Sequence, residues 1–477
     1  MLDIINQIND FIWTYLMIAL LLGTAVYFTF ASRGVQFRYF GEMLKLLARS
    51  GELHERKESK WSTELQTATA AVSKVSSFQA FAVSVASRVG TGNLAGVATA
   101  IAIGGPGSVF WMWVIAFLGS ANAFVESTLA QLFKVKGRNS FRGGPAYYIY
   151  KGTGSRFWAV TFAVLITITF ALAFNSVQSN TVALAVKPYG VSPLWSGIIL
   201  VILTIASIWG GIRTISRVSE ILVPVMAILY VLLATAVVVI NISSFPDVIS
   251  LILKNAFGID SMMGGGIGMA IMMGVKRGLF SNEAGEGSTP NAAATAAVSH
   301  PVKQGLLQTF GVFVDTLLIC TCTAFIILCS GVFDNGESGI TLTQSSLDAE
   351  VGSSYGSTFV AIAIFFFAFS SIIANYYYGE ANIRFITQRK LPVILLKVAA
   401  SGMVMIGAVV ELELVWAIAD ITMAMMTFCN IVALIVLGRY ALACLTDYTT
   451  QLREGKDPVY RASTIPSIAK LTDCWPL

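Results

Sequence analysis

Long apolar runs separated by short polar segments dominate this sequence. The runs lie at about 11–31, 78–103, 107–133, 157–183, 192–210, 220–242, 264–299, 304–331, 356–379, 391–410 and 414–437. Each can cross a bilayer as a helix, because about twenty residues span the hydrocarbon core. A helix also satisfies its own backbone hydrogen bonds, as lipid requires. The pattern therefore predicts an all-α integral membrane protein with eleven transmembrane helices.

Basic residues are concentrated in alternate connections between these helices. The segments 32–77, 134–156, 211–219, 300–303 and 380–390 hold 8, 6, 2, 1 and 3 lysines and arginines, whereas Lys187 and Lys254 are the two in the other connections. By the positive-inside rule, the N-terminus lies outside and the C-terminus in the cytoplasm of a plasma membrane, the inner membrane of a bacterium. Asp3 and Asp10 precede the first run without a positive leader, so we do not interpret it as a signal peptide.

The ten helices after the first divide into two groups of five with opposite topology. Inverted halves of this kind are typical of secondary transporters, and topology alone carries this prediction. We expect four parts: an N-terminal helix with a basic cytoplasmic loop (1–77), a first repeat (78–242), a second repeat (264–437) and a cytoplasmic tail (438–477), which we interpret as a surface appendage.

Composition agrees with a chain whose main solvent is lipid. Of 477 residues, 56% are hydrophobic and 12% are charged, whereas soluble domains carry about 25% charged residues. The net charge of +5 is spread along the loops, which argues against nucleic-acid binding. Six cysteines lie mostly in apolar runs, and His54 and His300 are the two histidines. We expect no disulfide framework, no zinc site and no cofactor.

In inverted-repeat transporters the first helix of each half is broken near the membrane midplane. The first half has Val-Gly-Thr-Gly-Asn at 89–93, where two glycines each weaken a helix by about 1 kcal/mol. Uncovered amides there would take a carboxylate, and uncovered carbonyls a cation such as sodium. The alternative is that Gly92 and Gly96 form only a helix-packing face.

A stronger interruption runs from Arg277 to Asn291 and holds three glycines, a proline and two carboxylates. Such a segment cannot face lipid, so it lines a cavity or is covered by protein; an ordinary cytoplasmic loop is the alternative. Ser370 and Ser371 lie in the span 356–379. Their hydroxyls either bond back to the preceding turn or complete a sodium cage opposite the first break.

Four charged residues fall within the predicted spans, where an isolated charge costs at least about 2.5–3.5 kcal/mol. They are Arg88, Glu126, Asp315 and Asp420. We predict that Arg88 pairs with a nearby carboxylate and that Arg277 pairs with Glu283. A position at a helix end would explain Asp420.

Several motifs resemble the alanine or glycine:cation symporter family. They are Gly-Gly-Pro-Gly-Ser-Val-Phe-Trp-Met-Trp-Val at 104–114 followed by Gly119, Val-Gly-Thr-Gly-Asn at 89–93, Phe-Arg-Gly-Gly-Pro-Ala at 141–146, Val-Gln-Ser-Asn at 177–180 and Phe-Ser-Asn-Glu-Ala-Gly at 280–285. The resemblance covers about residues 11–440, and Ser108 departs from the family's glycine or alanine. It implies a LeuT-type core with broken first and sixth core helices.

The resemblance also implies sodium-coupled uptake of a small neutral amino acid, with no enzymatic activity. It places the substrate carboxylate at the backbone N–H groups of Thr91 and Gly92. It places sodium between the carbonyls of Ala86 and Val89 and the hydroxyls of Ser370 and Ser371. It places Asn93 near the substrate and gives Gln178 and Asn180 the role of supporting the pocket. The other substrate contacts that it implies lie in the second break: Ser281, Asn282, Glu283, Gly285 and Asn291.

Side-chain selectivity depends on Asn291 and Asn375, where alanine-selective members of the family have large apolar groups. A polar pair favours a substrate able to hydrogen-bond, such as glutamine, because buried amides need partners; alternatively, each asparagine bonds to a helix backbone. We expect alanine or glycine first and glutamine as the alternative. An ion channel and a membrane-embedded enzyme are rival classes, but the breaks are asymmetric and no H-E-x-x-H or G-x-S-x-G motif is present. The oligomeric state is left open.

Overall fold

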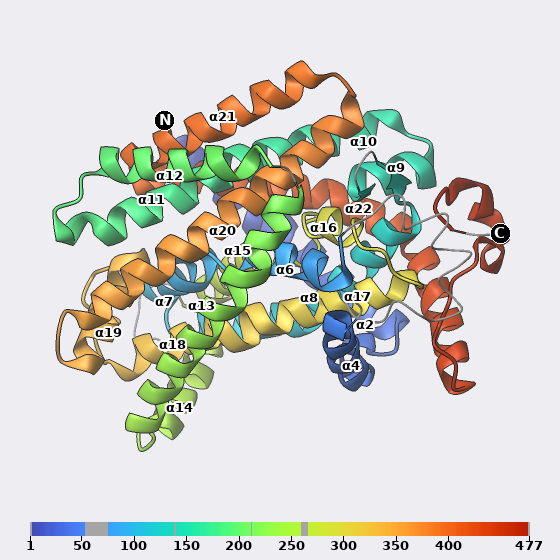
Figure 1. Cartoon of the computed structure of the whole chain (residues 1–477). Coiled ribbons are helices and arrows are strands. Elements are labelled where there is room, and N and C mark those ends of the chain that lie inside the picture. The colour runs from blue at the N-terminus through green and yellow to red at the C-terminus, as the bar shows by residue number, and fades with distance from the viewer. Residues whose placement is uncertain (1, 53–74, 138–139, 211, 259–265, 476–477) are drawn as a thin grey trace.

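A computed structural model describes residues 2–52, 75–137, 140–210, 212–258 and 266–475. The described chain is a bundle of helices (Figure 1). Its N-terminal part forms α1 (Leu2–Phe11), η1 (Ile12–Met17), α2 (Ile18–Ala31), α3 (Val35–Arg38) and α4 (Phe40–Glu52). The first three are continuous, so the first predicted span begins earlier than residue 11.

The next part covers the predicted first repeat. Its elements are α6 (Ser77–Arg88), η2 (Gly92–Gly96), α7 (Val97–Gly104), α8 (Ser108–Leu132), β1 (Val135–Lys136), β2 (Phe141–Arg142), α9 (Pro145–Thr153), α10 (Arg156–Ile166), η3 (Thr167–Phe174), α11 (Asn175–Val186), η4 (Lys187–Tyr189), α12 (Pro193–Ile208), α13 (Ile212–Ile240) and α14 (Phe245–Ala256). The strands β1 and β2 pair antiparallel and form a small hairpin in an otherwise helical chain.

The remaining part covers the predicted second repeat and the C-terminal segment. Its elements are α15 (Gly266–Asn282), α16 (Pro290–Ala293), α17 (Pro301–Val312), η5 (Phe313–Cys320), α18 (Thr321–Cys329), α19 (Gly339–Val351), α20 (Tyr355–Ile386), α21 (Lys390–Val409), α22 (Leu412–Arg453), η6 (Ala462–Thr464) and η7 (Pro466–Leu471).

Eight helices among the described residues are long and apolar enough to cross a membrane. Shorter apolar helices cover Gly92–Gly104 and Pro193–Ile208, and α15 has 17 residues. These three lie where the remaining predicted spans were placed. The multi-pass helical class is therefore confirmed, while eleven crossings and an inverted repeat stay predictions.

The bundle carries apolar side chains outside and polar side chains inside. On α13, Ile228 and Leu232 are 60% and 61% exposed, whereas Glu126 and Asp315 are fully buried. A soluble protein rarely shows a large continuous apolar surface, but lipid covers such a surface without cost. The buried polar groups must then satisfy one another within the bundle.

The two ends of the bundle carry different elements. Helices α14 and α19 lie at one end, and α9 and the C-terminal segment lie at the opposite one (Figure 1). We refer to these as the α19 end and the α9 end. Helix α22 has 42 residues, about 63 Å at 1.5 Å per residue, so it extends well beyond a hydrocarbon core of about 30 Å.

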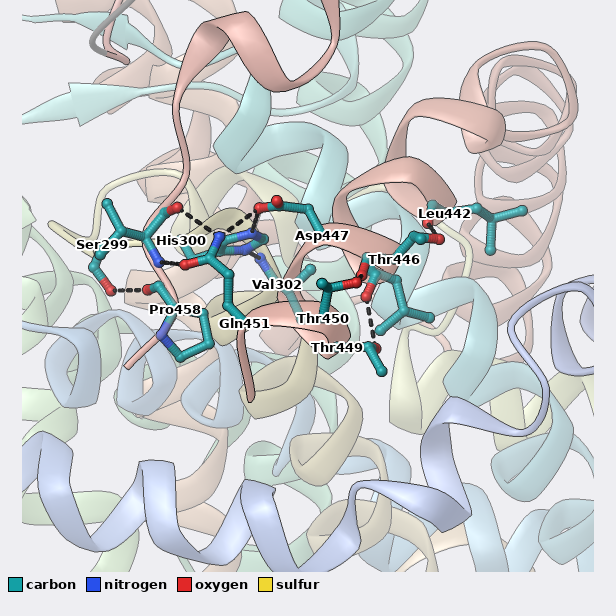
Figure 2. Close-up of polar contacts among 12 residues, drawn as sticks. Ser299, His300, Val302, Leu442, Thr446, Asp447, Thr449, Thr450, Gln451 and Pro458 are labelled. Carbon is teal, nitrogen blue, oxygen red and sulfur yellow. Dashed lines mark hydrogen bonds and ion pairs between the residues drawn. The ribbon is translucent and has the colours of Figure 1, made fainter. Parts of the chain in front are cut away.

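The segment after α22 packs against the α9 end of the bundle. At this junction the Ser299 Oγ donates a hydrogen bond to the Pro458 carbonyl (2.9 Å; Figure 2). The Tyr460 N–H donates another to the Ser299 carbonyl (2.9 Å). The Trp475 indole N–H donates to the Gln131 carbonyl (3.1 Å). Tyr460 is fully buried and Trp475 is 6% exposed, and this apolar burial holds the segment in place.

Candidate functional site

The first predicted break is present. Helix α6 ends at Arg88, and Val89 adopts an extended conformation (φ −77°, ψ 93°) before η2 begins at Gly92. A Cβ on Gly90 would collide with Ser371 Oγ. Glycine is needed there because the broken backbone approaches α20 so closely.

The second break is shorter than predicted. Helix α15 continues through Arg277 to Asn282, and non-helical backbone follows from Glu283 to the start of α16 at Pro290. Glu283 has a positive φ of 56°, as do Gly285 (95°) and Gly287 (84°). The helix continues through Arg277 because that charge has a partner, described below, and nothing forces the backbone to break there.

The two breaks lie against each other. A Cβ on Gly92 would lie 3.0 Å from the Ser281 Cα. The Asp315 carboxylate, which is fully buried, accepts a hydrogen bond from Asn93 Nδ2 at 2.7 Å and another from Ser281 Oγ at 2.8 Å. Asp315 therefore joins both breaks through one carboxylate. The sequence marked it as a buried charge, but its partners are 222 and 34 residues away.

The predicted sodium ligands divide into two groups. Ser371 Oγ lies 2.9 Å from the Ala86 carbonyl oxygen and 3.4 Å from that of Val89. Ser370 Oγ bonds to the Phe367 carbonyl in the preceding turn (2.8 Å), which Ser371 Oγ also contacts (3.0 Å). The geometry brings three of the four predicted oxygens together at the first break, with Ser371 as the contributing hydroxyl. Oxygen is the donor that hard cations prefer.

Gln178 supports the first break directly. Its Oε1 accepts hydrogen bonds from the Thr91 backbone N–H at 3.0 Å and from the Thr91 hydroxyl at 2.7 Å. One of the two amides predicted to hold the substrate carboxylate is thus bonded to Gln178 in this conformation. Asn180 donates instead to the Gly407 and Val410 carbonyls, which ties α11 to the end of α21.

The two asparagines predicted to set selectivity differ in their contacts. Asn291 Nδ2 donates to the Gly287 and Ser288 carbonyls at 3.0 and 2.7 Å, so it stabilises the second break. Asn375 Oδ1 lies 2.9 Å from Ser87 Oγ, whose single proton is donated to Glu283. The Asn375 Nδ2 is buried and has no hydrogen-bond partner among the residues that the structure describes. Of these two asparagines, Asn375 therefore has an amide N–H group available for a substrate.

The remaining residues predicted in the second break contact the protein itself. Glu283 accepts hydrogen bonds from Ser87 Oγ (2.6 Å) and Ser288 Oγ (2.5 Å). Asn282 Oδ1 accepts from the Ala284 N–H (3.0 Å). The Gly285 N–H donates to Glu126, as described next. These contacts show how the break is held, and they leave the substrate roles of these residues as predictions.

Sequence reasoning missed the role of Glu126. Its carboxylate accepts hydrogen bonds from the Gly285 N–H (3.2 Å), the Gly287 N–H (3.0 Å) and Asn430 Nδ2 (2.9 Å). We call this contact the Glu126 clasp. The available signal was the carboxylate itself, because an ionisable residue inside a membrane marks a functional position by default.

Two predicted charge pairings are wrong. Arg277 pairs with Asp420 rather than Glu283, through two contacts of 3.0 and 3.2 Å, and Lys276 Nζ lies 2.7 Å from the same carboxylate. Asp420 thus pairs with two cations of α15 and is not explained by a helix end. Among the described residues, Arg88 is hydrogen-bonded to Gln308 and Thr289 and forms no salt bridge. Neutral oxygens solvate its charge.

Comparison with known proteins agrees with this geometry. The sequence model of the sodium:alanine symporter family matches residues 1–462. The chain belongs to this family. It is 48% identical to the probable sodium/glutamine symporter GlnT of Bacillus subtilis, over 99% of this chain and 96% of that one, and 48% identical to the amino-acid carrier protein AlsT of the same organism, over 99% and 97%.

More distant similarities extend the comparison. The sodium/alanine symporter AgcS of Methanococcus maripaludis is 36% identical over 91% of this chain and 94% of that one. Among solved structures, MhsT in complex with L-phenylalanine aligns with a TM-score of 0.54 at 14% identity, covering 83% of this chain and 92% of that chain. The structural likeness shows the LeuT-type fold alone.

Proposed function

We propose that this protein is a sodium-coupled symporter that imports a small neutral amino acid by alternating access. The observation that carries the proposal is the meeting of two broken helices at Asp315, beside a group of oxygens at Ala86, Val89 and Ser371. Broken helices offer main-chain amides and carbonyls where a zwitterion and a cation can be bound together. Membership of the sodium:alanine symporter family supports this function.

Sodium would bind between the first break and α20, using the carbonyls of Ala86 and Val89 and the Ser371 hydroxyl. The substrate carboxylate would bind at the Thr91 and Gly92 amides, once Gln178 releases the Thr91 N–H. The membrane potential contributes about 2.3 kcal/mol per charge per 100 mV, equivalent to about fiftyfold accumulation at one sodium per substrate.

We place the protein in the bacterial inner membrane with the α9 end in the cytoplasm. The basic loops at 134–156 and 380–390 belong to that end, and the positive-inside rule assigns such loops to the cytoplasm. The N-terminus then lies outside. The five-plus-five inverted repeat follows from the same topology.

Alanine or glycine is the first substrate, and glutamine is the second candidate. The buried Asn375 Nδ2, which lacks a partner in the described part of the chain, favours glutamine because its side-chain carbonyl would accept that hydrogen bond. Relatives at 48% and 36% identity are named for glutamine and for alanine, so the family admits both.

Uptake of labelled alanine, glycine and glutamine into proteoliposomes tests the proposal. We expect accumulation above the external concentration when sodium is high outside, and only equilibration when potassium replaces sodium. Vesicles without protein provide the control. Equal accumulation with and without the sodium gradient contradicts sodium symport, and the ranking of the three substrates decides selectivity.

A further inference from the structure

Glu286 is a buried carboxyl group that the proposed transport function leaves without a role. It lies in the second break between Gly285 and Gly287 and is fully buried. Neither of its carboxyl oxygens has a hydrogen-bond partner among the described residues. Buried polar side chains are nearly always hydrogen-bonded, so a carboxyl group with two free oxygens points to a ligand.

The charged groups near Glu286 are two carboxylates, which disfavour an additional negative charge, and one guanidinium, which favours it. They are Glu283 in the same break, Glu126 from α8 and Arg88 from α6. Both neighbouring carboxylates already hold several donors, namely two hydroxyls at Glu283 and two N–H groups with one amide at Glu126. Arg88 donates to neutral oxygens of Gln308 and Thr289. None of these donors is hydrogen-bonded to the Glu286 carboxyl group in this conformation.

An ionised Glu286 would be a third carboxylate, beside Glu283 and Glu126, in a site with one guanidinium. Burying an uncompensated carboxylate costs several kcal/mol, and like charges nearby increase that cost. A bound proton removes the charge and needs one oxygen. A metal ion needs several ligands, and no group of three or more histidine, cysteine or acidic residues suited to a metal occurs in the part of the chain that the structure describes.

We propose that Glu286 is a proton-binding site, loaded in the conformation described and unloaded when the second break opens to water. The loop around it is closed by the Glu126 clasp, because the two N–H groups that Glu126 holds belong to Gly285 and Gly287, the residues on either side. Release of the clasp frees both flanks of Glu286 and exposes it to solvent. The inference rests on the proposed transport cycle, in which this break moves.

A measurement independent of transport tests the site. Infrared difference spectra of the full-length protein in lipid are recorded while pH rises from 5 to 9, with and without Glu286→Gln. We expect wild type to show the carbonyl band of a buried protonated carboxylic acid that Glu286→Gln lacks. An identical band in both proteins overturns the proposal. So does loss of the wild-type band on adding sodium at constant pH, which would assign a sodium site instead.

Transport then tests whether the proton matters. Sodium-driven uptake of labelled alanine and glutamine is measured across the same pH range for wild type, Glu286→Gln and the control Glu413→Gln, whose carboxylate is exposed at the start of α22. Because glutamine mimics the protonated acid, we expect Glu286→Gln to transport with a pH dependence that varies less than twofold. Wild type and the control should lose most of their uptake on the alkaline side.

A variant that keeps the wild-type pH profile overturns the proposal. If Glu286→Gln does not transport, its thermal stability and the infrared comparison still decide the protonation of Glu286. If wild type itself shows no sodium-driven uptake, the proposed symport fails, while the infrared result on the proton site stands separately.

Discussion

At the scale of single residues, the interior of this bundle is organised by a few side chains that each hold several backbone or polar groups. Asp315 joins the two breaks, Glu126 clasps the second one and Gln178 holds the first. Each replaces the hydrogen bonds that interrupted helices cannot make for themselves. Changing such a residue should affect transport more than folding of the surrounding helices.

Ser371 and Ser370 form a matched pair for testing the sodium site. Both hydroxyls contact the Phe367 carbonyl of their own helix, and Ser371 Oγ in addition lies beside the Ala86 carbonyl of the first break. We expect Ser371→Ala to raise the sodium concentration for half-maximal uptake by about tenfold, equivalent to about 1.4 kcal/mol. Ser370→Ala should leave it nearly unchanged. Equal effects of the two changes would place the cation elsewhere.

Asn375 offers a test of substrate selectivity. Asn375→Leu keeps a similar volume but removes the partnerless Nδ2. If that group binds a glutamine side chain, the ratio of glutamine to alanine uptake should fall by about tenfold, because one buried hydrogen bond is worth about 0.5–1.5 kcal/mol. Measuring both substrates in the same vesicles controls for expression. An unchanged ratio would remove Asn375 from the selectivity argument.

Asp420 forms salt bridges with two buried cations, Lys276 and Arg277. Removing one partner of a buried pair costs about 3–5 kcal/mol, because an uncompensated charge remains. We expect Asp420→Asn to lower the thermal unfolding temperature in detergent markedly. The double variant Asp420→Asn with Lys276→Met should recover part of the loss. A single variant as stable as wild type would show that water reaches these cations.

At the scale of elements, His300 makes the start of α17 sensitive to pH. Its Nδ1 accepts the Val302 N–H (3.2 Å), and its Nε2 lies 3.1 Å from Asp447 Oδ2 (Figure 2). A ring that accepts at Nδ1 is the neutral tautomer with its proton on Nε2. Burial lowers the pKa of His300 below its usual value of about 6.5, although Asp447 opposes the shift.

The sign of the effect follows from this pKa. Between the lowered pKa of His300 in the folded protein and its usual pKa of about 6.5, the unfolded chain binds more protons than the folded one. The stability of the folded protein therefore falls as pH decreases through that interval. We expect wild type to lose thermal stability from pH 7.5 to 5.5. His300→Asn, which keeps a capping oxygen without a titrating ring, should lose less. Identical losses would mean that other groups control acid sensitivity.

Both breaks could be predicted from sequence because glycine and proline act locally. The first break, at 89–93, lies where two glycines weaken the helix, whereas the second begins later than expected. Arg277 alone suggested an early end to the helix, but its partner Asp420 is 143 residues away. Likewise, the Glu126 clasp joins residues 159 and 161 apart. Contacts between residues so far apart in the chain depend on how the helices pack, and a single sequence does not reveal that packing.

At the scale of the whole molecule, the orientation in the membrane can be tested with single cysteines. Tyr355 is 78% exposed near the α19 end, and Arg389 is exposed between α20 and α21 at the other end. A membrane-impermeant thiol reagent added to intact cells should label Tyr355→Cys directly and Arg389→Cys only after permeabilisation. The unmodified protein is the control, since the native Cys322 and Cys329 are partly exposed. The reverse pattern would invert the topology.

Helix α22 fastens the second half of the chain at three levels. It supplies Asp420 to α15, Asn430 to the Glu126 clasp and Asp447 to the start of α17. These anchors are spread over about 40 Å at 1.5 Å per residue. Because α22 is one continuous helix, it cannot break all three contacts together without leaving the bundle. If the bundle opens at one face of the membrane, we therefore expect the contact nearest that face to break. The contact at the opposite face would remain and act as the hinge.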